Sequence, residues 1–327
     1  EQPKTKQIMK KLAVFAVLAA IVASCADDNP PRVVDNDGLV SPNLQMDIVT
    51  ASGQSPLTGI LTIMPCKAGT SIYFGNYVNR KLTPLYGYYQ VKDGIFYHEA
   101  VNRELSLPAG AYNMIYWGTP KYEEPIYAHP ALKDPAYVIG EDMSEQRFGL
   151  YRMLPDTTSY PTFDLVHTVQ SANIGSEDLK ASLKRVVTGL KVSIKNKDNG
   201  ILSSSIDSMT VRVTNIAGEL NFYTGAPQGN PRTVAFPLVR SVDSTQMSNA
   251  TVMLFPSFGK PEFQMSILLK NGNVKSFKQT LNAPLTANSK LTLTLTLGDI
   301  FSEESSGEFT IDNWNEESQT IDVPILD

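Results

Sequence analysis

The sequence predicts an all-β protein in which a β-sandwich body follows an export signal. Short runs rich in Val, Ile, Leu, Tyr and Phe recur along the chain, separated by turn residues such as Asp93-Gly94 and Pro108-Ala109-Gly110. The clearest run, residues 290–297, alternates Leu with Thr, so its leucines line one face of a strand. Asn271-Gly272-Asn273 lies between two further runs and is a strong hairpin signal. Strands this short and closely spaced favour a sandwich over a parallel sheet with helical crossovers.

The predicted strands form two groups. The first group covers residues 57–64, 71–74, 85–91, 94–97 and 111–117, and the second covers residues 190–194, 209–213, 263–269, 274–281, 290–297, 309–314 and 320–326. Residues 119–161 are rich in Pro and Tyr and predict a long excursion with a short helix near residues 141–151. Between the groups, Ser176 as an N-cap, with Glu177 and Asp178 in the first turn, predicts a helix over residues 176–183.

The length of the chain predicts two folded domains. About three hundred residues follow the export signal, which is more than one hydrophobic core usually serves. We assign an upstream extension and signal to residues 1–24, a tether rich in Asp, Asn and Pro to residues 25–41, an N-terminal β-sandwich domain to residues 42–183 and a C-terminal one to residues 184–327.

The export signal ends in a cysteine. Met9-Lys10-Lys11 is followed by an apolar run over residues 12–22, which is too short for a membrane-spanning helix of about 20 residues. Val22-Ala23-Ser24-Cys25 resembles a lipobox. In a lipobox the thiol of the cysteine receives a lipid, and the cysteine becomes the first residue of the mature chain. We therefore expect a lipoprotein that carries palmitate or a similar acyl chain on Cys25 and is held to a membrane by it.

The residues after the lipid resemble an export tag to the cell surface. Ala26-Asp27-Asp28-Asn29 is acidic, as are the tags that send some lipoproteins to the outer face of the outer membrane, although a solvated linker explains it equally well. Residues 1–24 contain four Lys and one Glu, which leaves 24 basic against 32 acidic residues and a net charge of −8. This balance excludes the basic surface typical of nucleic-acid binding.

No pattern of catalytic or metal-binding residues is present, so the sequence predicts neither an enzyme nor a cofactor. The histidines, His98, His129 and His167, are scattered and match no metal-ligand spacing. The paired carboxylates are Glu123-Glu124, Glu303-Glu304 and Glu316-Glu317, and all three pairs lie in polar contexts where solvation is expected.

Two further features have a structural and a functional interpretation. Cys66 has no partner once Cys25 is acylated and is expected to be a small buried apolar residue rather than a nucleophile. The first group of strands is rich in aromatic residues, which fit a sandwich core better than a glycan-stacking surface. These residues are Tyr86, Tyr88, Tyr89, Tyr112, Tyr116, Trp117, Tyr122 and Tyr127.

Four segments together resemble one known family. They are the lipobox at residues 22–25, the turn and strand at residues 107–118, the segment at residues 183–192 and the closing strand at residues 309–315. In order and spacing they are similar to the fimbrillin-associated (FimB-like) anchor subunits of type V pili. The resemblance implies two tandem transthyretin-like β-sandwich domains, pilin subunits of the same fimbria as partners through strand exchange, and attachment of the fibre to the outer membrane through lipid.

The resemblance leaves the role within the pilus open. Stalk subunits of the family lose their lipidated N-terminal segment by cleavage after an arginine, whereas anchors keep it and end the growth of the fibre. Arg32, the only arginine between Cys25 and the first domain, follows Pro30-Pro31, a poor context for cleavage, so the anchor role is favoured. A tip adhesin of the same pilus and a surface glycan-binding lipoprotein are the alternatives, with a glycan or a host molecule as ligand.

Overall fold

The structure is a computed structural model that describes residues 37–297 except 51, 85–86, 100–101, 122–125 and 197, together with the backbone of residues 306–313. Within these residues β-strands dominate, and the one helical element is a short 3-10 turn, η1 (Met143–Glu145). The all-β prediction is therefore confirmed.

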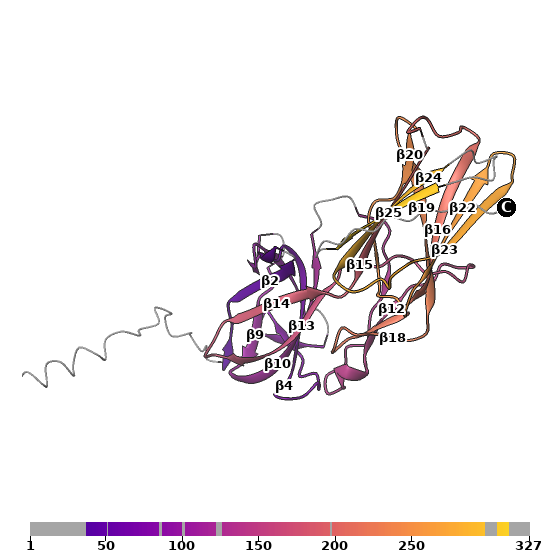
Figure 1. Cartoon of the computed structure of the whole chain (residues 1–327). Coiled ribbons are helices and arrows are strands. Elements are labelled where there is room, and N and C mark those ends of the chain that lie inside the picture. Colours follow the sequence, from indigo (N-terminus) through magenta and orange to yellow (C-terminus); the bar gives the residue numbers. More distant parts are fainter. Residues whose placement is uncertain are drawn as a thin grey trace, which may run out of the picture.

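The first half of the molecule is a sandwich of two sheets (Figure 1). The larger sheet has the order β3 (Gly53–Pro56), β2 (Leu44–Thr50), β14 (Leu179–Arg185), β13 (Val166–Ile174), β10 (Gly110–Pro120), β4 (Gly59–Lys67), β7 (Tyr88–Lys92) and β8 (Ile95–Phe96). The smaller sheet has the order β1 (Leu39–Val40), β9 (Leu105–Pro108), β5 (Asn76–Val78) and β6 (Lys81–Thr83). Apolar side chains from both sheets, among them Leu61, Leu107 and Tyr116, fill a common core.

The second half contains another large sheet and a small one. The large sheet has the order β23 (Val274–Thr280), β22 (Glu262–Leu269), β16 (Ile206–Ile216), β19 (Arg232–Arg240), β20 (Gln246–Ser248), β15 (Thr188–Asn196), β24 (Ser289–Leu297) and β25 (Ser306–Asn313), with β21 (Val252–Leu254) beside β15. The small sheet has the order β11 (Leu132–Lys133), β12 (Arg147–Leu150), β17 (Glu219–Asn221) and β18 (Pro227–Gln228).

Strand β10 contributes to two cores. Met114 and Tyr116 point into the core of the first half, while Ile115 and Trp117 belong to a second core that continues into the other half. There the Trp117 indole donates a hydrogen bond to the carbonyl of Phe222 at 2.8 Å. Both faces of β10 are therefore buried, and the halves share packed side chains rather than only a linker.

Residues 121–165, here called the bridging segment, bind both halves. Glu141 accepts a backbone hydrogen bond from Tyr73 of the first half, and Thr162 donates one to Met253 of the second. The expected helix near residues 141–151 is wrong beyond η1, because residues 147–150 form β12 with alternating burial and pair with β17.

The helix expected over residues 176–183 is also wrong. Residues after Asp178 form β14, in which Leu179, Ala181 and Leu183 point inward at every second position. Ser176 belongs to a tight turn in which its N–H bonds to the carbonyl of Asn173, and it caps no helix. The burial of every second residue, which is typical of a strand, thus outweighed the local N-cap signal. Residues that cap helices also begin turns.

The predicted strand at residues 71–74 is wrong, because Ile72 and Tyr73 form only isolated bridges, whereas the strands predicted around residues 263–281 and 290–297 are confirmed. β22 and β23 form the hairpin predicted around Asn271-Gly272-Asn273, and Asn271 accepts a hydrogen bond from the backbone of Asn273 at 3.0 Å. The four leucines of β24 are buried, with half-buried threonines between them. The predicted strand at residues 320–326 lies outside the described residues, and the division into two domains near Lys184 stays a prediction.

Candidate functional site

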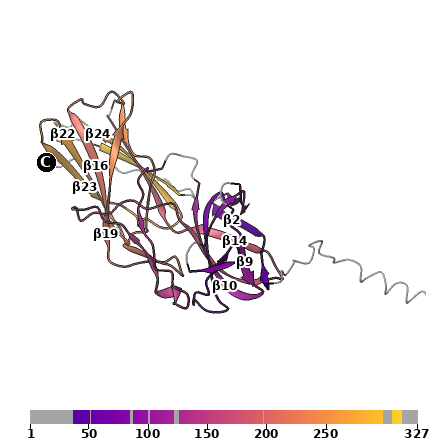
Figure 2. The same cartoon turned by 180° about the vertical axis from the view of Figure 1, so that it is seen from behind.

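The first described strand, β1, is seated at an edge of the smaller sheet of the first half. It pairs antiparallel with β9, placing Leu39 opposite Pro108 and Val40 opposite Leu107. Both of its residues are buried, with Leu39 6% and Val40 1% exposed. The described chain begins at the end of the first half that is remote from the second half (Figures 1 and 2). The last residues of the predicted tether are therefore part of the fold.

The chain then passes from one sheet of the sandwich to the other. Ser41 and the buried Ser106 of β9 bring their hydroxyl oxygens to 3.4 Å, and the carbonyl of Asn43 accepts a hydrogen bond from Leu179 N–H at 2.9 Å. From Leu44 onward β2 pairs in parallel with β14. The N-terminal segment therefore contributes to both sheets.

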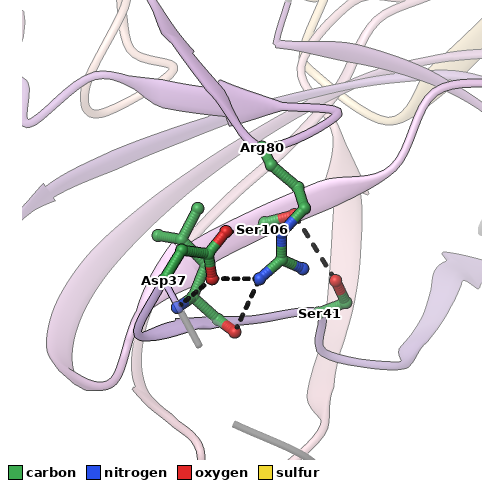
Figure 3. Close-up of polar contacts among 5 residues, drawn as sticks. Asp37, Ser41, Arg80 and Ser106 are labelled. Carbon is green, nitrogen blue, oxygen red and sulfur yellow. Dashed lines mark hydrogen bonds and ion pairs between the residues drawn. The ribbon is translucent and has the colours of Figure 1, made fainter. Parts of the chain in front are cut away.

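Asp37 and Arg80 form a side-chain clasp over β1 (Figure 3). Arg80 Nε donates to Asp37 Oδ2 at 2.6 Å, and Arg80 Nη2 donates to Asp37 Oδ1. The same Nη2 reaches the carbonyl of Leu39 at 3.4 Å, while Leu39 N–H donates to Asp37 Oδ1 at 3.1 Å. The two charged side chains therefore bind each other and the backbone of β1.

The turn between β5 and β6 positions Arg80. Asn79 and Arg80 are the two turn residues, with φ of 49° and 65°, the left-handed conformation of a two-residue hairpin turn. The Asn79 side chain accepts from Glu104 N–H at 2.7 Å and donates to the carbonyl of Asn102 at 3.0 Å. These bonds fix the turn to the start of β9, so the Arg80 guanidinium starts from a fixed position.

The clasp is ionised at neutral pH. Hydrogen bonds from the Arg80 guanidinium, and then from Leu39 N–H, lower the pKa of Asp37 to about 2. Both side chains are partly exposed, at 30% for Arg80 and 44% for Asp37, so salt in the medium screens their attraction.

Most residues named from the sequence do not join this site. Cys25 and Arg32 lie outside the described residues, as do the carboxylate pairs Glu123-Glu124, Glu303-Glu304 and Glu316-Glu317. Cys66 is buried as expected, and its burial raises the pKa of the thiol to about 12, which leaves it unreactive.

The aromatic residues of the first half are mainly core residues. Tyr89, Tyr112, Tyr116 and Trp117 are buried, Tyr127 is half-buried, and Tyr88 is 42% exposed with the Arg103 guanidinium 4.2 Å from its ring centroid. Tyr86 and Tyr122 lie outside the described residues. The structural interpretation of this cluster is therefore confirmed for four of its members.

Within the part of the chain that the structure describes, no three His, Cys, Asp or Glu side chains gather as metal ligands. His98 packs against Phe96, His129 against Tyr127 and His167 against Trp117. None of the helices in the described ranges is long and apolar enough to cross a bilayer.

The sequence analysis did not predict the clasp, and it placed Asp37 and the residues of β1 in the tether. Leu39 and Val40 were assigned to the tether at residues 25–41, and this assignment is wrong because they form β1. A strand of two residues has no periodicity to recognise. Asp37 and Arg80 are 43 residues apart, and no strand was predicted directly on either side of Asn79 and Arg80, so their turn gave no signal.

The fold and the seat of β1 define the class of the protein. It is an all-β chain built on a β-sandwich, and its first described strand is held at the edge of a sheet. The family described as fimbrillin-A associated anchor proteins Mfa1 and Mfa2 matches residues 37–320, and the chain belongs to this family. A comparison with curated proteins gave no match.

The chain was compared with solved structures, of which three are described. A candidate adhesin from Bacteroides ovatus is 12% identical, with a TM-score of 0.51 over 91% of this chain and 99% of that one. The fimbrial anchor protein Mfa2 from Porphyromonas gingivalis is 12% identical, with a TM-score of 0.47 over 86% and 98% of the chains. A candidate cell adhesion protein from Bacteroides uniformis is 14% identical, with a TM-score of 0.49 over 86% and 99%. Identities this low concern the fold alone, and only the first score is high enough to support it.

Proposed function

We propose that this chain is the lipid-anchored structural subunit of a type V fimbria, which joins the pilus to the outer membrane and ends the growth of the fibre. Membership of the anchor family supports a fimbrial role. The observation that supports the anchor role is the seat of β1, because a chain that keeps this strand in place offers no open β9 edge to another subunit.

The physical argument concerns main-chain hydrogen bonds. An unpaired sheet edge presents N–H and C=O groups that a strand from another subunit can satisfy, and this is the basis of assembly by strand exchange. Here β1 already pairs with β9, and Val40 packs in the core between the sheets. A pilin strand would have to displace β1 before it could pair with β9, so the fibre ends at this subunit.

The lipid supplies the other half of the role. Residues 26–36 separate the predicted acylated Cys25 from Asp37, and eleven residues span at most roughly 40 Å when extended. The folded body would then stand close to the lipid head groups, on the cell surface if Asp27 and Asp28 belong to an export tag. We also propose that the two halves are tandem transthyretin-like domains that divide near Lys184, with pilin subunits as partners.

The competing roles require exposed aromatic rings for ligand binding, and the described residues of the first half offer few of them. A tip adhesin or a glycan-binding lipoprotein would use the tyrosines of the first half as stacking platforms. Tyr89, Tyr112 and Tyr116 are buried, which leaves Tyr88 as the one markedly exposed ring among the described members of the cluster. The anchor role is therefore the function that the geometry supports best.

The test is deletion of the gene, followed by electron microscopy of fibres on cells and in the medium. We expect pilin to polymerise but fibres to be longer and shed, because both the attachment and the stop are lost. Complementation with a Cys25→Ala chain should leave fibres detached. Fibres that remain on the cells at normal length after deletion would exclude the anchor role.

A further inference from the structure

The backbone groups of Leu39 face away from β9. In an antiparallel ladder, a residue directs its N–H and its C=O to the same side. Pro108, the partner of Leu39 in the register, has no N–H to donate, and Leu39 gives its own N–H to Asp37 Oδ1. Among the described residues β1 is the end strand of its sheet, so these groups lie where a further strand would pair.

The clasp satisfies both of these groups with side chains. The Asp37 carboxylate accepts the N–H of Leu39, and the Arg80 guanidinium donates to its carbonyl. A carboxylate and a guanidinium thus supply the acceptor and the donor that a neighbouring strand would offer (Figure 3). They also hold each other, so neither can leave without breaking the ion pair.

The hairpin turn is built to hold this arrangement. A left-handed backbone at Arg80 is unfavourable for a residue with a Cβ, and such turns prefer Asn followed by Gly. The Asn79 side chain fixes the turn to Glu104 and Asn102, which compensates for the strain. An arginine in this position reaches β1 across the sheet, whereas glycine would offer nothing to bind.

We propose that the clasp of Asp37 and Arg80 caps the outer edge of β1, so that no further polypeptide strand can pair there. The inference deepens the proposed anchor function and rests on it for its biological meaning. In an anchor, β1 occupies the edge of β9 and the clasp closes the new edge that β1 itself creates. At the anchor subunit, the end of the fibre is then blocked by side chains as well as by the pairing of β1 with β9.

The test measures strand capture by the full chain in detergent. The probe is a fluorescein-labelled peptide with the sequence of residues 290–297, the most regular strand of this protein, and its binding is followed by anisotropy. Hydrogen exchange of the Leu39 amide is measured on the same samples, because it reports local opening of the edge. The variants are Asp37→Ala and Arg80→Ala. The matched control is Arg147→Ala, which removes an exposed ion pair with Glu219, 3.6 Å away.

We expect the wild type and the control to bind little peptide. Asp37→Ala and Arg80→Ala should bind it severalfold more tightly and exchange the Leu39 amide severalfold faster. The charge swap that combines Asp37→Arg with Arg80→Asp should behave like the single variants, because a guanidinium cannot accept the Leu39 N–H and a carboxylate cannot donate to its carbonyl. Unchanged peptide binding in the single variants, or full rescue by the swap, would overturn the edge cap.

Exchange of the Met114 amide in β10 shows whether a variant has loosened the whole first half. If Asp37→Ala does so, Arg80→Lys carries the test, since it keeps the charge but loses the forked geometry. It should capture more peptide than the wild type, and wild-type behaviour would refute the proposal. Peptide capture is measured on the isolated chain, so its result stands whether or not gene deletion changes the fibres.

Discussion

The stability of the protein should fall between pH 7 and pH 5 because of one buried imidazole. His167 lies on β13, and its ring packs against Trp117 with centroids 4.4 Å apart. Burial lowers the pKa of His167 from its ordinary 6.5 to about 4, opposed in part by a hydrogen bond with the Tyr223 backbone. In the described structure its Nε2 has no hydrogen-bond partner, so the ring is held neutral.

The direction of the effect follows from linkage. Between pH 6.5 and pH 4 the unfolded chain binds a proton at this ring and the folded chain does not, so protonation favours unfolding. The contribution of His167 is thus complete above pH 6.5 and is lost as the pH falls toward 4. A full shift from 6.5 to about 4 corresponds to about 3 kcal/mol, of which about 2 kcal/mol is lost between pH 7 and pH 5.

The assay is urea unfolding at pH 7 and pH 5, followed by tryptophan fluorescence, for wild type, His167→Gln and His129→Gln. Carboxylates titrate in all three proteins, so the informative quantity is the difference between each variant and the wild type. His167→Gln should lose about 2 kcal/mol less than the wild type on acidification, whereas His129→Gln, at an exposed position, should lose as much as the wild type. Equal losses in wild type and His167→Gln would refute this account of the buried ring.

Three further outcomes are expected. Leu293→Ala in the buried face of β24 should lower the free energy of unfolding by about 2 to 5 kcal/mol and half-buried Thr294→Ala by far less, as measured by denaturant unfolding; equal costs would contradict the assigned faces. Asp164→Ala should cost about 3 to 5 kcal/mol in the same assay, because it leaves buried Arg185 without the carboxylate that holds its Nε at 2.8 Å and Nη2 at 2.7 Å. Cys25→Ala should move the folded body from the membrane fraction to the soluble one, and full retention in the membrane would rule out lipid anchoring.

The parts of the fold that the sequence predicted are those in which a local pattern and tertiary burial agree. The alternation of Leu and Thr in β24 predicted which face of the strand is buried. The tertiary structure agrees with it, because β24 lies between its parallel partner β15 and its antiparallel partner β25 in one sheet. The hairpin of β22 and β23 was predicted because Asn-Gly is specific for such turns. At Ser176 the same reasoning failed, since residues that cap helices also begin turns, and only the pairing of β14 with β2 decides between them.

The candidate site was beyond sequence reasoning for a different reason. β1 is too short to have a pattern, and the clasp joins two residues that come together only after β9 and β5 have paired. Asp37 in an Asp-rich stretch is typical of a solvated tether, and Arg80 is typical of a surface residue. The family resemblance predicted that the lipidated N-terminal segment would be retained, but neither that its last residues form a strand nor what would hold that strand.

The parallel pairing of β2 with β14 has a mechanical consequence. β2 begins just after β1, and β14 ends at Arg185, where the chain runs directly into β15 of the second half. A pull between the N-terminus and the second half would draw the start of β2 and the end of β14 in opposite directions along their length. The five residue pairs from Leu179↔Leu44 to Leu183↔Ile48 would then carry the load together, in shear, instead of opening one after another. Resistance to such a pull depends on the rate of unfolding, so under tension this joint should yield later than a hairpin pulled apart from one end.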